Sequence, residues 1–136
     1  MDCVFCKIIS GKIPAKIITE TEKSVAFLDA FPLTKGHTLV IPKKHHEKIQ
    51  NMTREENIDL FSTVHKIISS VDKLTGSTLV AVHNGKQAGQ EIPHVHVHLV
   101  PRSSGDSGGP IHKMFDSTPN LSDSEWDEVF QKLKII

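Results

Sequence analysis

The sequence predicts a single α+β domain: an antiparallel sheet of about five strands, one long helix and a short C-terminal helix. Short β-branched or apolar runs recur along the chain with turn-forming residues between them, and one long amphipathic pattern of helical period interrupts the series. Most connections between the runs are too short for the crossovers of a parallel sheet. A chain of 136 residues also suits one hydrophobic core.

Five runs have the composition of strands, and glycine, proline or polar residues bound each of them. We expect strands at residues 16–20, 24–29, 38–41, 78–83 and 94–100. The polar residues 21–23 join the first two runs as a hairpin. Pro42 and Pro101 end the third and fifth runs, because proline lacks the N–H group that a sheet ladder requires.

A capping box predicts the start of the long helix. Thr53 is followed three residues later by Glu56, so each side chain can accept a hydrogen bond from the other residue's backbone N–H. Apolar residues then recur at spacings of three and four until Gly76, a typical terminator. The expected buried face consists of Ile58, Phe61, Val64, Ile67, Ile68, Val71 and Leu74.

The last part of the chain changes in character. Residues 103–110 are rich in serine, glycine, aspartate and proline, which predicts a flexible loop. A second capping box, Ser122 with Glu125, predicts a short helix within the C-terminal tail, residues 111–136. One side of that helix carries Trp126, Val129, Phe130 and Leu133. We therefore expect the core of the domain over residues 3–102.

Composition excludes several classes of protein. Sixteen basic and sixteen acidic residues give a net charge of zero, so no basic field exists to bind a nucleic-acid polymer. The apolar runs fall far short of the ~20 residues of a membrane span, and the N-terminus does not resemble a signal peptide. Two cysteines exclude a disulfide scaffold. We expect a protein without membrane partners in the cytoplasm, with the nucleus also possible.

The strongest chemical signal is a run of alternating histidines. His94, His96 and His98 would line one face of a strand at intervals of about 6.6 Å, while the residues between them enter the core. The run could be a solvated strand face, a three-histidine zinc site or a site of nucleophilic catalysis by a neutral imidazole. The spacing alone does not choose among them.

A glycine-containing loop directly precedes this run. Residues 84–90 supply glycines, through which backbone N–H groups can approach an anion, and amide side chains that can hold phosphoryl oxygens or a ribose. A plain turn is the alternative. Because the loop adjoins three histidines, the sequence favours an anion site.

These segments together resemble the histidine-triad superfamily of nucleotide hydrolases and transferases, in particular its Hint-like branch with an N-terminal Cys-x-x-Cys pair. The resemblance covers roughly residues 3–102, and its motifs occur in order along the chain. The matching segments are residues 5–9, 13–15, 26–29, 35–42 and 88–102.

The resemblance implies a function. Such proteins cleave nucleoside phosphoramidates, adenylate conjugates or dinucleoside polyphosphates through a covalent nucleotidyl-histidine and release a nucleoside monophosphate. It also implies a purine nucleotide, with adenine the expected base, and a homodimer. Two rival hypotheses are a nucleotide-sensing or scaffold module without significant turnover and a three-histidine zinc hydrolase.

The resemblance also assigns roles to individual histidines. His96 corresponds to the nucleophile, and His98 to the residue that contacts the transferring phosphate. His94 would orient His96 through its backbone carbonyl, and His37 would support the cluster.

The nucleotide itself is expected to contact a wider set of residues. Asp29 would bind the ribose hydroxyls, and Gly89 with its neighbour Gln90 would cradle the α-phosphate. The base would lie in an apolar cleft, although these side chains could equally be ordinary core: Phe5, Ile13, Phe27 and Leu28.

Two positions depart from the family pattern. His83 stands where asparagine or glutamine is common, and it could still donate a hydrogen bond to a nucleotide. Glu91 stands where a phosphate-binding serine or threonine is common. Since a carboxylate repels phosphate, we expect Glu91 to turn away towards Arg102.

The pair Cys3 and Cys6 could be a redox motif, half of a zinc site or two ordinary thiols. No strand precedes the pair, which disfavours a thioredoxin-type motif. The resemblance implies a structural Zn²⁺ held by Cys3, Cys6, His45 and His94, with His46 able to compete with His45. A closed site of this kind leaves no position for a reacting water.

Overall fold

The computed structural model describes residues 2–135, which form two compact units. The first unit ends at Asp106 and the second begins at Ser107. The expectation of one domain over the whole chain stays a prediction. Among the described residues, no helix is both long enough and apolar enough to cross a bilayer.

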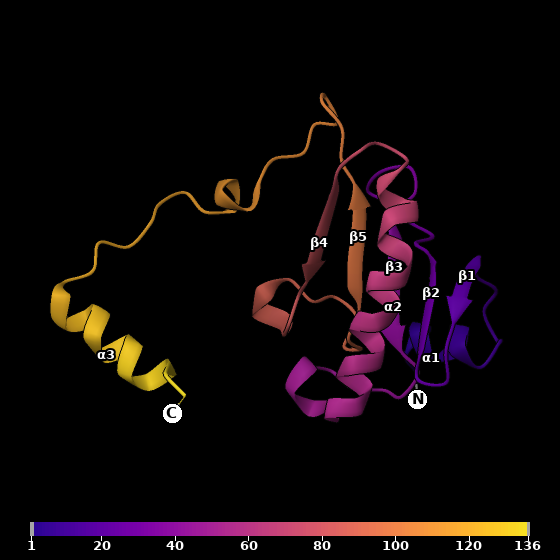
Figure 1. Ribbon diagram of the computed structural model, residues 1–136, viewed down its shortest axis with the longest axis horizontal. Helices are drawn as coiled ribbons and strands as arrows, with labels where there is room; N and C mark the ends of the chain where they lie inside the picture. Colours follow the sequence, from indigo (N-terminus) through magenta and orange to yellow (C-terminus); the bar gives the residue numbers. More distant parts are fainter. Residues whose placement is uncertain (1, 136) are drawn as a thin grey trace. The chain divides into compact units, whose positions relative to one another are not determined.

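The first unit contains a five-stranded sheet, a short helix α1 and a long helix α2 (Figure 1). All neighbouring strands are antiparallel, in the order β1-β2-β3-β5-β4. The predicted α+β fold with five antiparallel strands is thereby confirmed. The elements are α1 (Val4–Ile9), β1 (Ile17–Glu20), β2 (Ser24–Leu28), β3 (Thr38–Pro42), η1 (Ile49–Asn51), α2 (Arg54–Asp72), β4 (Thr78–Val82), η2 (Lys86–Ala88) and β5 (Val97–Pro101).

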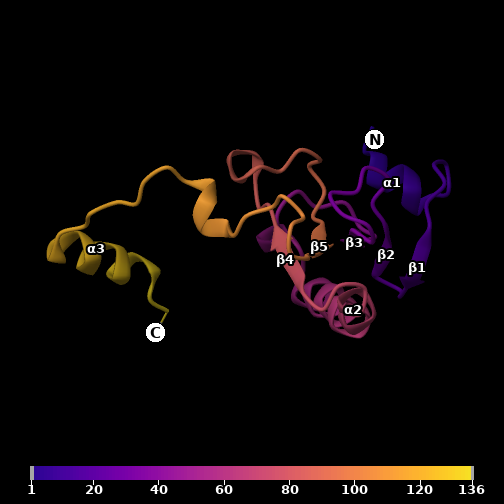
Figure 2. The same cartoon turned by 90° about the horizontal axis from the view of Figure 1, so that it is seen from above.

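Helices cover both faces of the sheet (Figure 2). Residues that alternate along each strand pack on different helices. On one face Ala26, Val40 and Leu99 pack against α2. On the other face Phe27 and Leu39 pack with Phe5 of α1. The strand β5 lies between β3 and β4, so His98 pairs with Leu39 on one side and with Ala81 on the other. His98 is thus held within the sheet.

The strand β5 begins at Val97, three residues later than expected. The backbone before it has other partners. The N–H of His94 donates to the carbonyl of Ile92, and the N–H of Val95 donates to the carbonyl of His46. The alternation nevertheless extends over this segment, because Val95 is buried on the α2 side together with Val97.

The capping box at Thr53 is confirmed, since its hydroxyl accepts from the N–H of Glu56 at 3.1 Å. The predicted buried face of α2 is partly wrong, because Ile58, Phe61 and Leu74 are exposed. The apolar residues of α2 form two stripes, and only one of them meets the sheet. That stripe is Leu60, Val64, Ile67 and Val71.

The helix α1 is absent from the sequence-based assignment. Its six residues are too few for a clear helical period, and Cys3 at its N-cap makes no side-chain hydrogen bond to it. Phe5 anchors the helix to the sheet. Because α1 carries Cys6 and starts after Cys3, the fold brings both thiols beside the histidine segments.

The second unit contains η3 (Ile111–Met114) and α3 (Asp123–Leu133). The predicted C-terminal helix is confirmed, with Ser122 as its N-cap and Glu125 completing the capping box. Its apolar stripe is exposed, and none of residues 107–135 is buried.

Candidate active site and metal cluster

The ring of His96 is fixed by one short hydrogen bond to the backbone. Its Nδ1 lies 2.7 Å from the carbonyl oxygen of His94. Because a carbonyl oxygen only accepts, Nδ1 carries the proton and the neutral ring has its lone pair on Nε2. The residue is 7% exposed. His96 can therefore act as a nucleophile through Nε2.

The ring of His98 is fixed by a chain of two hydrogen bonds from Leu33 through His37, hereafter the relay. The backbone N–H of Leu33 donates to Nδ1 of His37 at 3.0 Å, so neutral His37 carries its proton on Nε2. That Nε2 lies 3.0 Å from Nδ1 of His98 and donates to it. His98 then carries its own proton on Nε2. Within residues 2–135 this nitrogen is buried without a hydrogen-bond partner, so it can donate to a ligand.

Burial keeps these rings neutral. Together with the nearby His96, His37 and His83 rings, it lowers the pKa of His98 to about 4. Burial also lowers the pKa of His96, although the hydrogen bond to the His94 carbonyl favours the protonated ring. The pKa of His37 is lowered by burial as well, against the attraction of Asp29. At neutral pH the site therefore presents lone pairs and N–H donors.

Asp29 lies at the edge of the relay. Its Oδ1 accepts from the N–H of Phe31 at 2.9 Å, and its Oδ2 lies 3.6 Å from Nε2 of His37. Ligand atoms of Asp29, His37 and His98 lie within 4.8 Å of one another. The Leu33 hydrogen bond disfavours a metal there, because it leaves a proton on the His37 nitrogen that would have to coordinate.

The residues predicted to contact the base are unequally exposed. Phe5 and Phe27 are core residues with ring centroids 5.8 Å apart. Phe5 also packs edge-on against His96, with centroids 5.0 Å apart. Ile13 is half-buried and Leu28 is exposed, so these two are the more accessible to a ligand.

Gln90 pins the glycine-containing loop between β4 and β5. Its Oε1 accepts from the N–H of Gly85 at 2.8 Å, and its Nε2 donates to the carbonyl of Glu47 at 2.8 Å. The adjacent Asn84 accepts from the N–H of Ile49 at 2.9 Å. Both polar atoms of the Gln90 amide are therefore used within the protein, so this side chain shapes the loop.

His83 lies between this loop and His98. The ring centroids of His83 and His98 are 5.4 Å apart. Gly89 has a φ of 104°, and a Cβ there would come within 3.2 Å of Cδ2 of His83. Glycine is required at this position both by the backbone conformation and by the close ring. The structure thus gathers His37, His83, His96 and His98 into one cluster, hereafter the imidazole cluster.

The expected contact of Glu91 with Arg102 is wrong. Arg102 pairs instead with Asp106, with Nε 2.7 Å from Oδ2 and Nη2 3.1 Å from Oδ1. Glu91 precedes β5 and Arg102 follows it, so the whole strand lies between them. Glu91 is exposed.

A second group of side chains has the composition of a metal site: Cys3, Cys6, His45 and His94, hereafter the metal cluster. Nδ1 of His94 lies 3.4 Å from Sγ of Cys3, 3.6 Å from Sγ of Cys6 and 3.2 Å from Nδ1 of His45. Ligands of a tetrahedral zinc, with Zn–N about 2.05 Å and Zn–S about 2.3 Å, lie roughly 3.3–3.8 Å apart. The separations of these donor atoms are close to that spacing.

The protonation of His94 also suits a metal. Its Nε2 lies 2.8 Å from the carbonyl oxygen of Pro42 and must donate to it, which leaves the lone pair on Nδ1 facing the thiols. Burial lowers the pKa of His94 to about 4, although the Pro42 carbonyl opposes this change. A zinc shared by His94, His96 and His98 would have to take one ring nitrogen of His94 from its present partner, either the Pro42 carbonyl or the thiols. The geometry thus disfavours a three-histidine zinc hydrolase.

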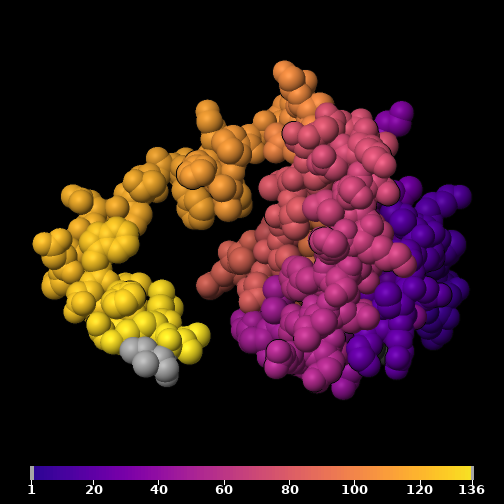
Figure 3. Space-filling view, viewed as in Figure 1, coloured from indigo at the N-terminus to yellow at the C-terminus, as the bar shows by residue number. Residues whose placement is uncertain are grey.

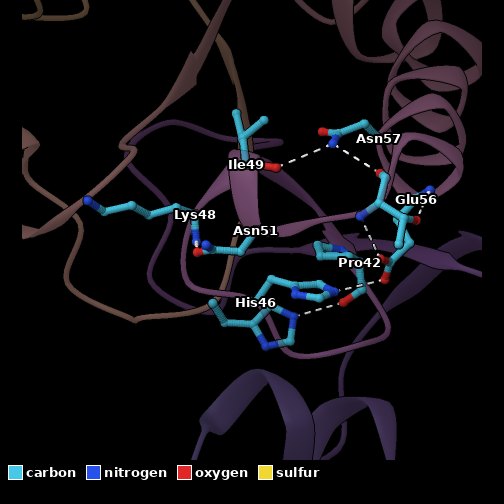
Figure 4. A network of polar contacts seen from close by, with 9 residues as sticks. Pro42, His46, Lys48, Ile49, Asn51, Glu56 and Asn57 are labelled. Carbon is cyan, nitrogen blue, oxygen red and sulfur yellow. Dashed lines mark hydrogen bonds and ion pairs between the residues drawn. The ribbon is translucent and has the colours of Figure 1, made fainter.

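His46 lies outside the metal cluster. Its Nε2 is 2.9 Å from Oε2 of Glu56 (Figure 4). Oε1 of Glu56 accepts from the N–H of Thr53 at 2.8 Å. Burial opposes ionisation of Glu56, but the hydrogen bonds from Thr53 and His46 lower its pKa. The structure places His45 among the four donors and uses His46 to hold the start of α2.

Three groups that orient the site were missed from the sequence. They are the N–H of Leu33, the carbonyl of Pro42 and the second carboxylate oxygen of Glu56. Backbone groups carry no side-chain signal. The capping box with Thr53 already explains a glutamate at position 56. Nothing in the sequence therefore indicates that its other carboxylate oxygen contacts His46.

A model of the HIT domain matches residues 10–105. The chain belongs to the HIT family. It is 44% identical over 134 residues to an uncharacterised HIT-like protein of Methanocaldococcus jannaschii, covering 97% of this chain and 98% of the relative. It is 35% identical over 135 residues to the adenosine 5'-monophosphoramidase of Schizosaccharomyces pombe, covering 98% and 100%. It is 39% identical over 107 residues to an adenylylsulfatase of Arabidopsis thaliana, covering 77% and 54%.

Solved structures agree with this membership of the HIT family. The histidine triad nucleotide-binding protein of Candida albicans has a TM-score of 0.83 and 30% identity, covering 97% of this chain and 94% of that one. A zinc-bound histidine triad family protein of Mycobacterium smegmatis has a TM-score of 0.68 and 39% identity, covering 79% of each chain. The family predicted from the sequence is confirmed.

The hydrogen bonds of the imidazole cluster predict its NMR spectrum. In ¹H–¹⁵N correlation spectra at neutral pH, His96 should show a proton on Nδ1, whereas His37 and His98 should show protons on Nε2. On acidification His98 should titrate near pH 4, because burial disfavours its charged form. Its folded pKa lies below the ordinary value of 6.5, so this ring should make folding less favourable as the pH falls from about 6.5 to 4. A His98 that is charged at pH 6 would contradict this assignment.

Proposed function

We propose that this HIT protein is a nucleotide hydrolase and nucleotidyl transferase that acts at the α-phosphate of a nucleoside phosphoramidate or related adenylate conjugate. The observation that carries the proposal is the hydrogen bond from Nδ1 of His96 to the carbonyl of His94, which leaves an unprotonated Nε2 on a buried ring. The names of two relatives, a phosphoramidase and an adenylylsulfatase, support adenylates with a phosphorus–nitrogen or phosphorus–oxygen–sulfur linkage. Dinucleoside polyphosphates are a second candidate class, since they offer the same phosphorus to the nucleophile.

The reaction takes two displacements at phosphorus. In the first, the lone pair on Nε2 of His96 bonds to the α-phosphorus. The bond from phosphorus to the leaving nitrogen or oxygen breaks, and the leaving group keeps the electron pair. A leaving nitrogen also takes up a proton from solvent, whereas sulfate leaves as the anion. In the second, water attacks phosphorus, loses a proton to solvent and displaces Nε2. The nucleoside monophosphate is released, and His96 returns to its neutral form.

His98 donates a hydrogen bond to the transferring group in this proposal. Its Nε2–H is buried and unpartnered within the described residues, and the relay from Leu33 through His37 keeps the proton there. A donor fixed before the substrate arrives needs no reorganisation when charge develops on the phosphoryl oxygens. His37 acts through His98 and is therefore a positioning residue.

The remaining predicted contacts surround these two rings. Asp29 binds the ribose hydroxyls through the lone pairs that Phe31 leaves available, and Leu28 and Ile13 line the base cleft. His83 and the backbone at Gly89 approach the phosphate from the loop side. A purine, adenine by the names of the relatives, is the proposed base.

We further propose that the metal cluster holds a structural Zn²⁺. Its Cys₂His₂ donor set and the 3.2–3.6 Å spacings support this, and one solved neighbour is zinc-bound. Four protein ligands leave no open coordination position, so this zinc supplies rigidity and takes no part in bond breaking. The two thiols and the two ring nitrogens are the groups that would hold it.

Substitution of the nucleophile tests the proposed function. Purified wild type and His96→Ala are incubated with adenosine 5'-phosphoramidate, adenosine 5'-phosphosulfate and a diadenosine polyphosphate, and AMP release is followed by chromatography. Acid-quenched wild type should carry an adenylyl group detectable by mass spectrometry. The variant should lack the adduct and lose at least about 10³-fold in kcat, because the covalent route is closed.

The alternative function is a nucleotide-sensing module. Wild type that binds AMP in calorimetry but releases none from any of the three substrates would contradict the hydrolase and support the sensor. His98→Ala serves as a graded control, since it removes the donor and keeps the nucleophile. It should retain the adduct and lose about 10²-fold to 10³-fold in kcat, the effect typical of one lost transition-state donor.

We propose a homodimer on a separate observation. Apolar side chains are exposed on α2, at Ile58 and Phe61, and on β4, at Leu79 and Val80. The helix α2 forms the front of the first unit in Figure 3, and β4 is an edge strand of the sheet. Edge strands and exposed apolar faces of this kind are typical of interfaces between copies.

Light scattering tests the dimer directly. At micromolar concentration the mass should be twice the 15.1 kDa of one chain. Val80→Glu should lower the mass to that of one chain, because it places a charge in an apolar contact. A wild-type mass of one chain would refute the dimer.

A further inference from the structure

Every polar atom of His94 has a partner. Its backbone N–H donates to the carbonyl of Ile92 at 2.8 Å. Its Nε2 donates to the carbonyl of Pro42, which is labelled in Figure 4, at 2.8 Å. Its Nδ1 faces Cys3, and its carbonyl accepts from Nδ1 of His96 at 2.7 Å. The residue is completely buried. One residue is therefore shared by the metal cluster, through its ring, and by the nucleophile, through its carbonyl.

Other contacts restrain the same short stretch from both sides of the sheet. The N–H of Val95 donates to the carbonyl of His46, and the His46 ring binds Glu56 at the start of α2. These contacts hold the backbone between His94 and His96 on the α2 side of the sheet. On the other side, α1 reaches both histidines through Phe5, with ring centroids 5.7 Å from His94 and 5.0 Å from His96.

The contacts within the metal cluster are weak unless a cation occupies it. Thiols are poor hydrogen-bond donors, and Nδ1 of His94 presents a lone pair 3.2 Å from another ring nitrogen, that of His45. Bound Zn²⁺ would replace these weak contacts by four coordination bonds. The ring of His94, the segment that holds His45 and the start of α1 would then be fixed relative to one another.

We propose that the metal cluster positions the catalytic nucleophile. Cys3, Cys6 and His45 are positioning residues: they hold the His94 ring, the His94 carbonyl holds Nδ1 of His96, and Nε2 of His96 is thereby aimed at phosphorus. The reaction named here rests on the proposed function. The structural coupling between the metal cluster and the His96 ring does not.

This coupling predicts which kinetic constant changes. Two of the residues proposed to bind the nucleotide have other supports: Asp29 accepts from the N–H of Phe31, and Gly89 packs against His83. Loss of the metal should therefore leave KM nearly unchanged. It should lower kcat, because a nucleophile that leaves its attack geometry reacts more slowly although substrate still binds.

The experiment compares three preparations with holo wild type: Cys3→Ser, Cys6→Ser and wild type stripped of metal by a chelator. Ile8→Ala is the matched control, because Ile8 packs in the same apolar cluster on α1 but ligates nothing. For each preparation we would measure zinc content, thermal stability, kcat and KM for adenosine 5'-phosphoramidate, and the ¹⁵N signals of the His96 ring at one neutral pH. Zinc is then returned to the stripped protein.

Holo wild type should contain about one zinc per chain and show His96 as a single Nδ1–H tautomer. The metal-free preparations should show a mixture of the two tautomers and a kcat lowered about 10-fold to 100-fold, with KM within about threefold, the scale seen when the outer support of a site is removed. Adding zinc back to the stripped protein should restore both the single His96 tautomer and the kcat of holo wild type. Ile8→Ala should lose thermal stability but keep the single tautomer and a kcat close to that of wild type.

Metal-free protein that remains folded, keeps one His96 tautomer and keeps its kcat within twofold would overturn the proposal. An Ile8→Ala variant with a kcat as low as that of the cysteine variants and the same mixture of His96 tautomers would also overturn the proposal. The effect would then come from a general loosening of α1. If holo wild type releases no AMP, the proposed function fails. The tautomer of His96 with and without zinc still decides the coupling in that case.

Discussion

The hydrogen bond between Nδ1 of His96 and the carbonyl of His94 is the contact on which the site depends. It decides which nitrogen of the ring is basic, and it does so through a backbone group that cannot change its protonation. The sheet loses part of a strand to this arrangement. The backbone N–H groups of His94 and Val95 donate to the carbonyls of Ile92 and His46, and the carbonyl of His94 accepts from the His96 ring. The hydrogen-bonded ladder of β5 therefore begins only at Val97.

The second constraint is the burial of several imidazoles close together. Charged rings at these distances would repel one another, and burial disfavours the charge on each. The rings are compatible because they are neutral and because each proton has a defined place, from Leu33 through His37 to His98. The relay ends in one buried N–H without a protein partner among the described residues. An unsatisfied donor is costly in a fold, and here it lies beside the nucleophile.

Much of this could be predicted from the sequence, where a side-chain pattern exists to be read. The alternation from His94 to His98 separates the histidines from the core valines, and the two capping boxes mark the starts of α2 and α3. The errors occur where tertiary contacts decide. Leu60 is buried and Phe61 is exposed because only one of two apolar stripes on α2 meets the sheet. The relay begins at a backbone N–H, which leaves no trace in the sequence.

The central claim is that His96 attacks phosphorus through Nε2 and forms a covalent intermediate. The most direct measurement is the stereochemistry of hydrolysis in ¹⁸O-labelled water, with an adenosine 5'-thiophosphoramidate that is chiral at phosphorus. Each in-line displacement inverts the configuration at phosphorus, so two successive displacements should give a product with the configuration retained. Inversion would show that water attacks the substrate directly, and it would contradict a nucleophilic role for His96.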